Sequence, residues 1–216
     1  MGFYDHLVSG TEKARMAFLH IPILQRALHG EVTAEEYQAF LGQAYHHVKH
    51  TVPLMMACGA RLPEHNHWLL KALGEYIEEE MGHEHWILDD IRACGGDPDA
   101  VRLATPHPAT ELMVAYAYDM VQRRNPAGFF GMVFVLEGTS VRLATQAAQA
   151  IKERLSLPGN AFRYLTSHGT LDQSHLAFFE GLMNRVEAPA DQAMIRHCAN
   201  MFYRLYGDIF RSLSSQ

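Results

Sequence analysis

The sequence predicts an all-α protein, one domain over residues 1–216 built from about seven helices. Apolar residues recur at i, i+3 and i+4 along nearly every segment, whereas the alternating pattern of strands is absent. Hydrophobic residues make up 48% of the chain, enough to bury a substantial core. No low-complexity linker and no short-period repeat divides the chain.

The first helix is expected over residues 4–28, with a disturbance near Ile21-Pro22 because proline removes a helical hydrogen bond. His29-Gly30 ends this helix. The stretch Thr33-Ala34-Glu35-Glu36 has the form of a capping box and starts a second helix. Pro53 should kink the second helix before it ends near residue 61.

A third helix is expected over residues 65–93, ending at Gly95-Gly96. Residues 97–108 are rich in proline and predict the main loop. A fourth helix should cover residues 109–123.

Asn125-Pro126 is typical of an N-cap followed by proline at the first helical position, and it starts a fifth helix to about residue 155. A sixth helix should run to about residue 186, and the last one from Pro189 to about residue 212. The apolar face of the last helix could pair two chains in a homodimer. The sequence slightly favours the alternative, in which this face covers the core of its own chain.

The charge pattern argues against nucleic-acid and membrane partners. The net charge is −6, and the 18 Lys and Arg residues form no basic run. The longest apolar run, residues 129–136, is too short to span a bilayer. No signal sequence is visible at the start, and the three cysteines form no CxxC motif. We therefore expect a cytoplasmic protein with reduced thiols.

One stretch of the sixth helix carries candidate metal ligands. His168, Asp172 and His175 have the spacing i, i+4, i+7, which places them on one helix face. They interrupt an apolar stripe, and buried polar groups are costly unless they are paired or bind a metal. Imidazole and carboxylate together suit zinc, iron or manganese. The alternative is a buried His-Asp-His hydrogen-bond relay without metal.

Two other stretches place charge beside apolar runs. Glu137 directly follows the apolar run of the fifth helix, so its carboxylate should be paired, protonated or metal-bound; an ion pair with Arg142 is the alternative.

Glu80 and His83 form the Glu-x-x-His pair that di-metal sites in helical bundles use. Glu78 with His85 is a competing register, and a solvated acidic face is the alternative to both. The combined inventory could bind two iron ions: Glu80, His83, Glu137, His168, Asp172 and His175.

These motifs together resemble the heme-oxygenase-like diiron oxidases and oxygenases. Residues 28–41 and 132–140 resemble segments of the wider heme-oxygenase-like and TenA-like superfamily, the second being similar to its "YVLEGS" stretch. The resemblance implies a heme-oxygenase-like helical fold and a site with two non-heme iron ions. It also implies a reaction that uses O2 on a small organic substrate, of the amine, amino acid or fatty acid class. Candidate pocket walls are Met55, Met56, Phe129, Phe130 and Phe134.

The chain departs from both patterns at specific positions. Where heme oxygenases have their axial histidine, this chain reads Lys13-Ala14-Arg15-Met16, which argues against heme binding. Diiron relatives usually add a carboxylate from the second core helix, which here has only histidines. His47 is the first candidate as a substitute ligand or as a proton donor near the metal, and His46 and His50 compete with it. The alternatives to a diiron enzyme are a non-catalytic metal- or ligand-binding protein and a heme oxygenase.

Overall fold

The computed structural model describes residues 2–213, except for the side chains of residues 168–175. All regular structure in the described part is helical, as expected, although it has more segments than seven. In chain order, the α-helices are α1 (Phe3–Gly10), α2 (Glu12–Leu19), α3 (Pro22–Leu28), α4 (Ala34–Val48), α5 (Thr51–Arg61), α6 (Leu69–Glu80), α7 (His83–Ala93), α8 (Pro98–Leu103), α9 (Pro108–Arg123), α10 (Phe129–Leu155), α11 (Arg163–Met183) and α12 (Pro189–Ser212). Short 3₁₀ turns, η1 (Glu64–Asn66), η2 (Pro126–Gly128) and η3 (Gly159–Ala161), precede α6, α10 and α11.

The segment expected as one N-terminal helix consists of three. The break at Pro22 is confirmed, since α3 begins there. A second break lies at Thr11, whose Oγ1 donates a hydrogen bond to the Leu7 carbonyl at 2.8 Å. Back-bonding of this kind bends helices, and it separates α1 from α2.

The capping box at the start of α4 is confirmed. Thr33 Oγ1 accepts a hydrogen bond from the Glu36 amide, and the Glu36 carboxylate accepts one from the Thr33 amide. The expected disruption of this helix by Pro53 is confirmed and is stronger than a kink, because α4 ends at Val48 and α5 begins at Thr51. Proline cannot donate a hydrogen bond to the carbonyl four residues before it, that of Lys49, and its ring clashes with that carbonyl. Pro53 therefore lies in the first turn of α5, where an amide has no helical partner to lose.

Two expectations for the middle of the chain also need correction. The predicted helix over residues 65–93 divides into η1, α6 and α7, because Gly82 adopts a positive φ of 93° between α6 and α7. The predicted loop over residues 97–108 contains α8. Asp97 caps α8 by accepting hydrogen bonds from the amides of Asp99 and Ala100.

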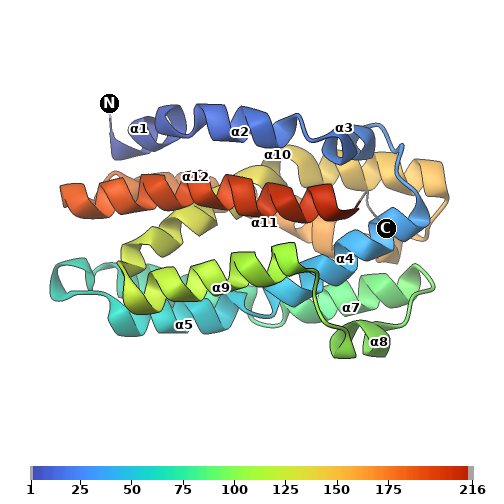
Figure 1. Cartoon of the computed structure of the whole chain (residues 1–216), viewed down its shortest axis with the longest axis horizontal. Helices are drawn as coiled ribbons and strands as arrows, with labels where there is room; N and C mark the ends of the chain where they lie inside the picture. The colour runs from blue at the N-terminus through green and yellow to red at the C-terminus, as the bar shows by residue number, and fades with distance from the viewer. Residues whose placement is uncertain (1, 214–216) are drawn as a thin grey trace.

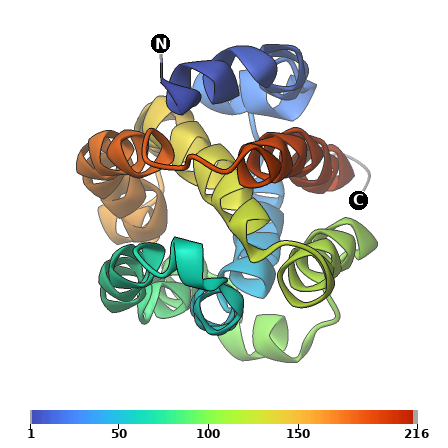
Figure 2. The same cartoon turned by 90° about the vertical axis from the view of Figure 1, so that its left-hand side faces the viewer.

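Helix α10 is the centre of the bundle. It packs on α3, α9, α11 and α12, and in the end-on view of Figure 2 its yellow ribbon lies in the middle with the other helices around it. In Figure 1, α1 to α3 lie along one edge of the molecule and α5, α7 and α8 along the opposite edge. Among the described residues, the segment Pro126–Leu155 is the one helix long and apolar enough to cross a membrane, and most of its apolar window is buried inside the bundle. Packing at the centre of the bundle accounts for that apolarity.

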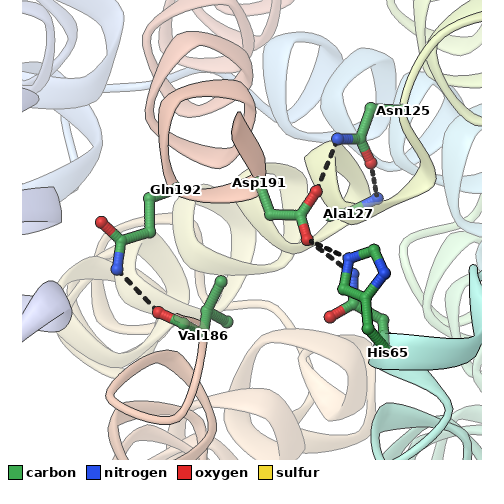
Figure 3. Close-up of polar contacts among 7 residues, drawn as sticks. His65, Asn125, Ala127, Val186, Asp191 and Gln192 are labelled. Atoms are coloured by element: carbon green, nitrogen blue, oxygen red, sulfur yellow. Dashed lines mark hydrogen bonds and ion pairs between the residues drawn. The ribbon is translucent and has the colours of Figure 1, made fainter. Parts of the chain in front are cut away.

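The buried carboxylate of Asp191 links the start of α12 to two earlier 3₁₀ turns, η1 and η2. Asp191 accepts hydrogen bonds from the side chains of His65 at 3.1 Å, Asn66 at 2.7 Å and Asn125 at 2.7 Å (Figure 3). Burial acts to raise the pKa of Asp191, but the hydrogen bonds from Asn125, Asn66 and His65 outweigh it, so the pKa is lowered. This carboxylate holds η1, η2 and α12 together.

Candidate metal centre

Carboxylates from two distant parts of the chain face one internal cavity. Glu80, the last residue of α6, and Glu137, in the first half of α10, both line a cavity of about 80 Å³. His47 of α4 lines the same cavity. The remaining lining residues are Val48, Thr51, Met55, Phe129, Met132, Val133, Leu136, Ser140, Tyr164 and Tyr206. An apolar wall around two carboxylates is a costly arrangement unless a cation or hydrogen bonds compensate for it.

Glu137 lines this cavity from α10, the helix that the others surround. The residues of α10 just before Glu137 are buried in the core, and the Oε2 atom of Glu137 is shielded from solvent. Arg142, the alternative partner considered from the sequence, belongs to the exposed side of α10. The structure therefore places Glu137 with the cavity.

Glu80 and His83 meet across the turn at Gly82. His83 Nδ1 lies 3.0 Å from Glu80 Oε2, and both side chains are largely buried. When Nδ1 carries the proton, the Nε2 atom of His83 has the lone pair that binds metals. In the competing register, Glu78 is exposed, and His85 is 64% exposed and pairs with Glu84.

Three neighbouring histidines point to different surroundings. His47 is buried, and its ring packs edge-on against Tyr206 beside the cavity. His50 Nδ1 lies 3.1 Å from the Tyr118 hydroxyl, and His46 Nδ1 lies 3.3 Å from Lys49 Nζ. Of these three residues, His47 alone is among the described residues that line the cavity.

The ligands expected from the sixth helix are positions of α11. The side chains of His168, Asp172 and His175 lie outside the described residues. The described residues before and after them include Tyr164, which lines the cavity, and Phe179, which is fully buried. Helix α11 packs against both α10 and α7. Within the described part of the chain, no group of three or more His, Cys, Asp and Glu could hold a metal ion by itself.

Asp90, which was not predicted as a functional residue from the sequence, anchors the start of α11. Asp90 is fully buried on α7 and accepts hydrogen bonds from the amides of Arg163 at 3.0 Å and Tyr164 at 2.9 Å. Burial raises the pKa of Asp90 to about 6, although these two hydrogen bonds act to lower it. Trp86 adds a second link, since the Arg163 guanidinium lies 4.5 Å from its ring centre. The signal in the sequence was the spacing of Asp90 from the buried His83, at i+7 on one face of α7.

The expected pocket walls are only partly correct. Met55 and Phe129 line the cavity. Phe130 and Phe134 are buried in the core away from its lining, and Met56 is 53% exposed. Tyr164 and Tyr206, which the sequence analysis did not select, complete the wall.

Fold and site together define a class of protein, a helical bundle whose internal cavity is lined by carboxylates and imidazole, as in metal-dependent bundle proteins. The chain belongs to the family of iron-containing redox enzymes, whose sequence profile matches residues 38–207. No match was found among curated proteins.

Solved structures confirm the heme-oxygenase-like fold. A domain of unknown function with this fold from Shewanella denitrificans is 21% identical, with a TM-score of 0.87, over 100% of this chain and 93% of that one. A TenA homolog from Pseudomonas syringae is 11% identical, with a TM-score of 0.82, over 99% and 93%. Heme oxygenase-1 from Synechocystis, solved in complex with heme, is 15% identical, with a TM-score of 0.77, over 100% and 93%.

Proposed function

We propose that this protein is a non-heme diiron oxidase or oxygenase that uses O2 to oxidise a small organic substrate. The observation that carries the proposal is the shared cavity. Glu80 and Glu137 come from different helices and line the same cavity, beside His47. Membership of the iron-containing redox enzyme family supports iron as the metal.

The chemistry of the donor set fits iron. Carboxylate and imidazole are the ligand types of non-heme iron sites. The proposed ligands are Glu80, His83 and Glu137 from the described part of the chain and His168, Asp172 and His175 from α11. Bound there, two iron ions would supply the redox chemistry and the open positions for O2.

The proposed ligands and the residues of the cavity wall would have different roles. Glu80 and Glu137 would offset the positive charge of the metals in a cavity with largely apolar walls. Asp172 is proposed as a third carboxylate ligand from its position on α11 alone. Glu80 also orients the ring of His83 by accepting a hydrogen bond from its Nδ1–H. Met55, Phe129 and Val133 surround the carboxylates with apolar side chains, which reduces their contact with water.

His47 lies on α4, the helix from which the resemblance would lead us to expect a further carboxylate. Its burial and its place in the cavity lining make it either a nitrogen ligand or the holder of a proton beside the site. We propose the proton-holding role. His47→Gln should then lower the rate of substrate oxidation more than the iron content.

Heme oxygenase is the rival enzyme, because similar structures bind heme. The position expected for an axial ligand falls on α2, where the chain reads Lys13-Ala14-Arg15-Met16. His20, which ends α2, is exposed, and its Nδ1 is 2.7 Å from the Met16 carbonyl. The described residues of α2 therefore favour the non-heme proposal.

The metal content of the purified protein after anaerobic ferrous loading tests the proposal, with a heme titration beside it. Close to two irons per chain and no heme absorption band are expected. One metal or none would contradict a diiron site, and a tight heme band would favour heme oxygenase. Loss of iron in His168→Ala and Asp172→Ala is expected, and full retention of iron and activity would refute the assignment of α11.

Oxygen uptake separates an enzyme from a non-catalytic metal-binding protein of the same fold. Ferrous iron and a reductant are supplied, and O2 consumption is followed with and without candidate substrates. Substrate-dependent consumption supports the enzyme. An iron-loaded protein that never shows such consumption over a broad substrate screen would favour a binding or regulatory role.

A further inference from the structure

Tyr206 of α12 lies between two internal cavities. It lines the cavity of the candidate metal centre, and it also lines a second cavity of about 100 Å³, which shares Ser140 and Tyr164 with the first. We refer to the second cavity as the apolar chamber, because Glu36 is the one charged residue in its described lining. Any molecule that extends from the metal centre into the apolar chamber therefore passes the side chain of Tyr206.

The hydroxyl group of Tyr206 has no hydrogen-bond partner among the described residues. Tyr206 is only 8% exposed, and burial raises its pKa well above the usual value, so the phenol keeps its proton at neutral pH. Other tyrosines of the core are paired. Tyr37 donates a hydrogen bond to the Ala161 carbonyl at 2.8 Å, and the Tyr116 hydroxyl lies 3.5 Å from Cys198 Sγ. A buried donor without an acceptor costs free energy, so Tyr206 is an exception that needs a physical reason.

Three aromatic rings hold the side chain of Tyr206 in place. The Phe18 ring stacks on it with 5.6 Å between ring centres, and the Phe210 ring packs against it edge-on at 4.9 Å. His47 packs edge-on at 5.8 Å. Close packing on several sides restricts a side chain to one rotamer. The side chain of Tyr206 therefore stays at the junction of the two cavities.

The charges around the two cavities restrict which group can accept a hydrogen bond from Tyr206. No Lys or Arg is present in the described lining of either cavity. The Glu36 carboxylate of the apolar chamber is already paired with Arg26. An anionic acceptor at the junction would therefore be buried without a positive partner in the described lining, and such burial is costly. A neutral oxygen atom avoids that cost.

We propose that Tyr206 is a substrate-binding residue whose hydroxyl donates a hydrogen bond to an uncharged carbonyl, ether or hydroxyl oxygen of the substrate. The inference rests on the proposed function, because the substrate is the molecule held at the metal centre. The free protein bears the cost of the unpaired hydroxyl, and the substrate supplies the missing acceptor. An analogue without that oxygen leaves the phenol unpaired, so Tyr206 selects against it.

Binding of two volatile probes tests the proposal without turnover. Cyclopentanone and methylenecyclopentane have nearly the same shape, but only the ketone carries an acceptor oxygen. Headspace gas chromatography measures the affinity of each probe for the anaerobic ferrous protein. Tyr206→Phe should lower the ratio of ketone to alkene affinity by about three- to tenfold, which corresponds to the loss of one hydrogen bond. An unchanged ratio would overturn the proposal, as would a wild type that does not bind the ketone.

Tyr203→Phe is the matched control for the binding experiment. Tyr203 lies one turn earlier on α12 and is 4% exposed, but it lines neither cavity. The Tyr203→Phe protein should keep the wild-type ratio of the two affinities. An equal fall of the ratio in both variants would assign the effect to the packing of α12 and would overturn the role of the Tyr206 hydroxyl.

Unfolding in urea separates a substrate-binding hydroxyl from a structural one. Tyr206→Phe should leave the midpoint unchanged or raise it, because the substitution removes an unpaired buried hydroxyl. Tyr37→Phe should lower the midpoint, because it removes the hydrogen bond to Ala161. A lower midpoint for Tyr206→Phe would show that its hydroxyl has a structural partner and would overturn the proposal.

Failure of the two proposals can be told apart. A protein that takes up no iron refutes the diiron site, whereas the ratio of probe affinities on the metal-free protein still tests the hydrogen bond from Tyr206. A protein that takes up two irons but has the same ratio in the wild type and in Tyr206→Phe refutes the role of Tyr206 alone.

Discussion

Neighbouring residues of the same type differ sharply in burial around the candidate metal centre. Glu80 and His83 are enclosed, whereas Glu78 and His85 are exposed, although the sequence alone leaves both pairs open. Helical periodicity could not decide between them because the helix breaks at Gly82, inside the motif. A change of helix direction alters which residues share a face.

This difference in burial provides a matched comparison. Glu80→Ala should lower iron affinity at least about tenfold, since loss of even an outer partner of a metal ligand costs that much. Glu78→Ala should leave it unchanged. Iron content after dialysis against a chelator measures both, and equal iron retention by the two variants would refute the role of Glu80.

Asp90 is a second residue whose contacts in the structure could not be predicted from the sequence pattern. From the sequence it is one of two adjacent aspartates in a helix, Asp89 and Asp90. In the structure it is the buried acceptor for the first amides of α11. The buried side of a helix can be predicted from spacing, but the partner on another helix cannot.

The pKa of Asp90 gives a pH dependence with a definite sign. Burial raises it from 3.8 to about 6, so a proton on Asp90 favours the folded state. Its contribution to the free energy of unfolding is therefore greatest below the unfolded pKa and is lost as pH rises through about 6. The free energy of unfolding of the wild type, relative to that of Asp90→Asn, should rise as pH falls from about 7 to about 5. Urea denaturation at several pH values measures it, and an opposite slope would contradict the assignment.

At the scale of elements, the ends of helices were predictable where local side chains cap them. The capping box at Thr33 and the stop at Gly95 depend on neighbours in sequence alone. The break at Lys49 and His50 also has a local cause, because it lies four residues before Pro53. The break at Gly82 was not predicted, since an isolated glycine is tolerated inside a helix. Local rules identify residues that tolerate a break, whereas packing decides which break occurs.

Gly82 makes the turn that brings Glu80 beside His83. Gly82→Ala should destabilise the fold by about 1–3 kcal/mol, because φ is 93° there and an alanine rarely adopts it. Gly82→Ala should also weaken iron binding, because a shift of this turn separates Glu80 from His83.

Gly74, inside α6, is the matched control. A Cβ there has nothing within 4 Å, and Gly74→Ala should stabilise the helix by about 0.5–1 kcal/mol. Thermal unfolding compares the two variants. Equal changes in both would mean that the turn at Gly82 is not strained by a side chain.

At the scale of the whole molecule, the all-α class and the heme-oxygenase-like fold were predictable. Apolar spacing determines which helices form, and one strongly apolar segment identifies the central helix α10. The Asp191 interaction between η1, η2 and α12 was not predictable, because its partners are distant in sequence.

Asp191→Ala should destabilise the protein by about 2–4 kcal/mol, since it leaves the buried amide of Asn66 and the half-buried amide of Asn125 without their acceptor. Asp208→Ala on the same helix removes an exposed pair with Arg211 and should cost within about 0.5 kcal/mol.

The pH dependence of the same variant tests the ionised state of Asp191. Its pKa is lowered in the folded state, so its stabilisation is present above the unfolded pKa and is lost as pH falls through the folded pKa. The difference between wild type and Asp191→Ala should therefore shrink in acid. Denaturation at acid and neutral pH measures this, and a constant difference would contradict the ionised interaction.

The sequence by itself determined the helical class and most helix ends, because these depend on spacing and on neighbours along the chain, and it supplied the candidate residues of the site as a prediction. Only the tertiary structure decided that Glu80, Glu137 and His47 line one cavity, that Asp90 holds α11, and that an apolar chamber adjoins the site. Those facts depend on how distant helices pack, and packing is a property of the whole core.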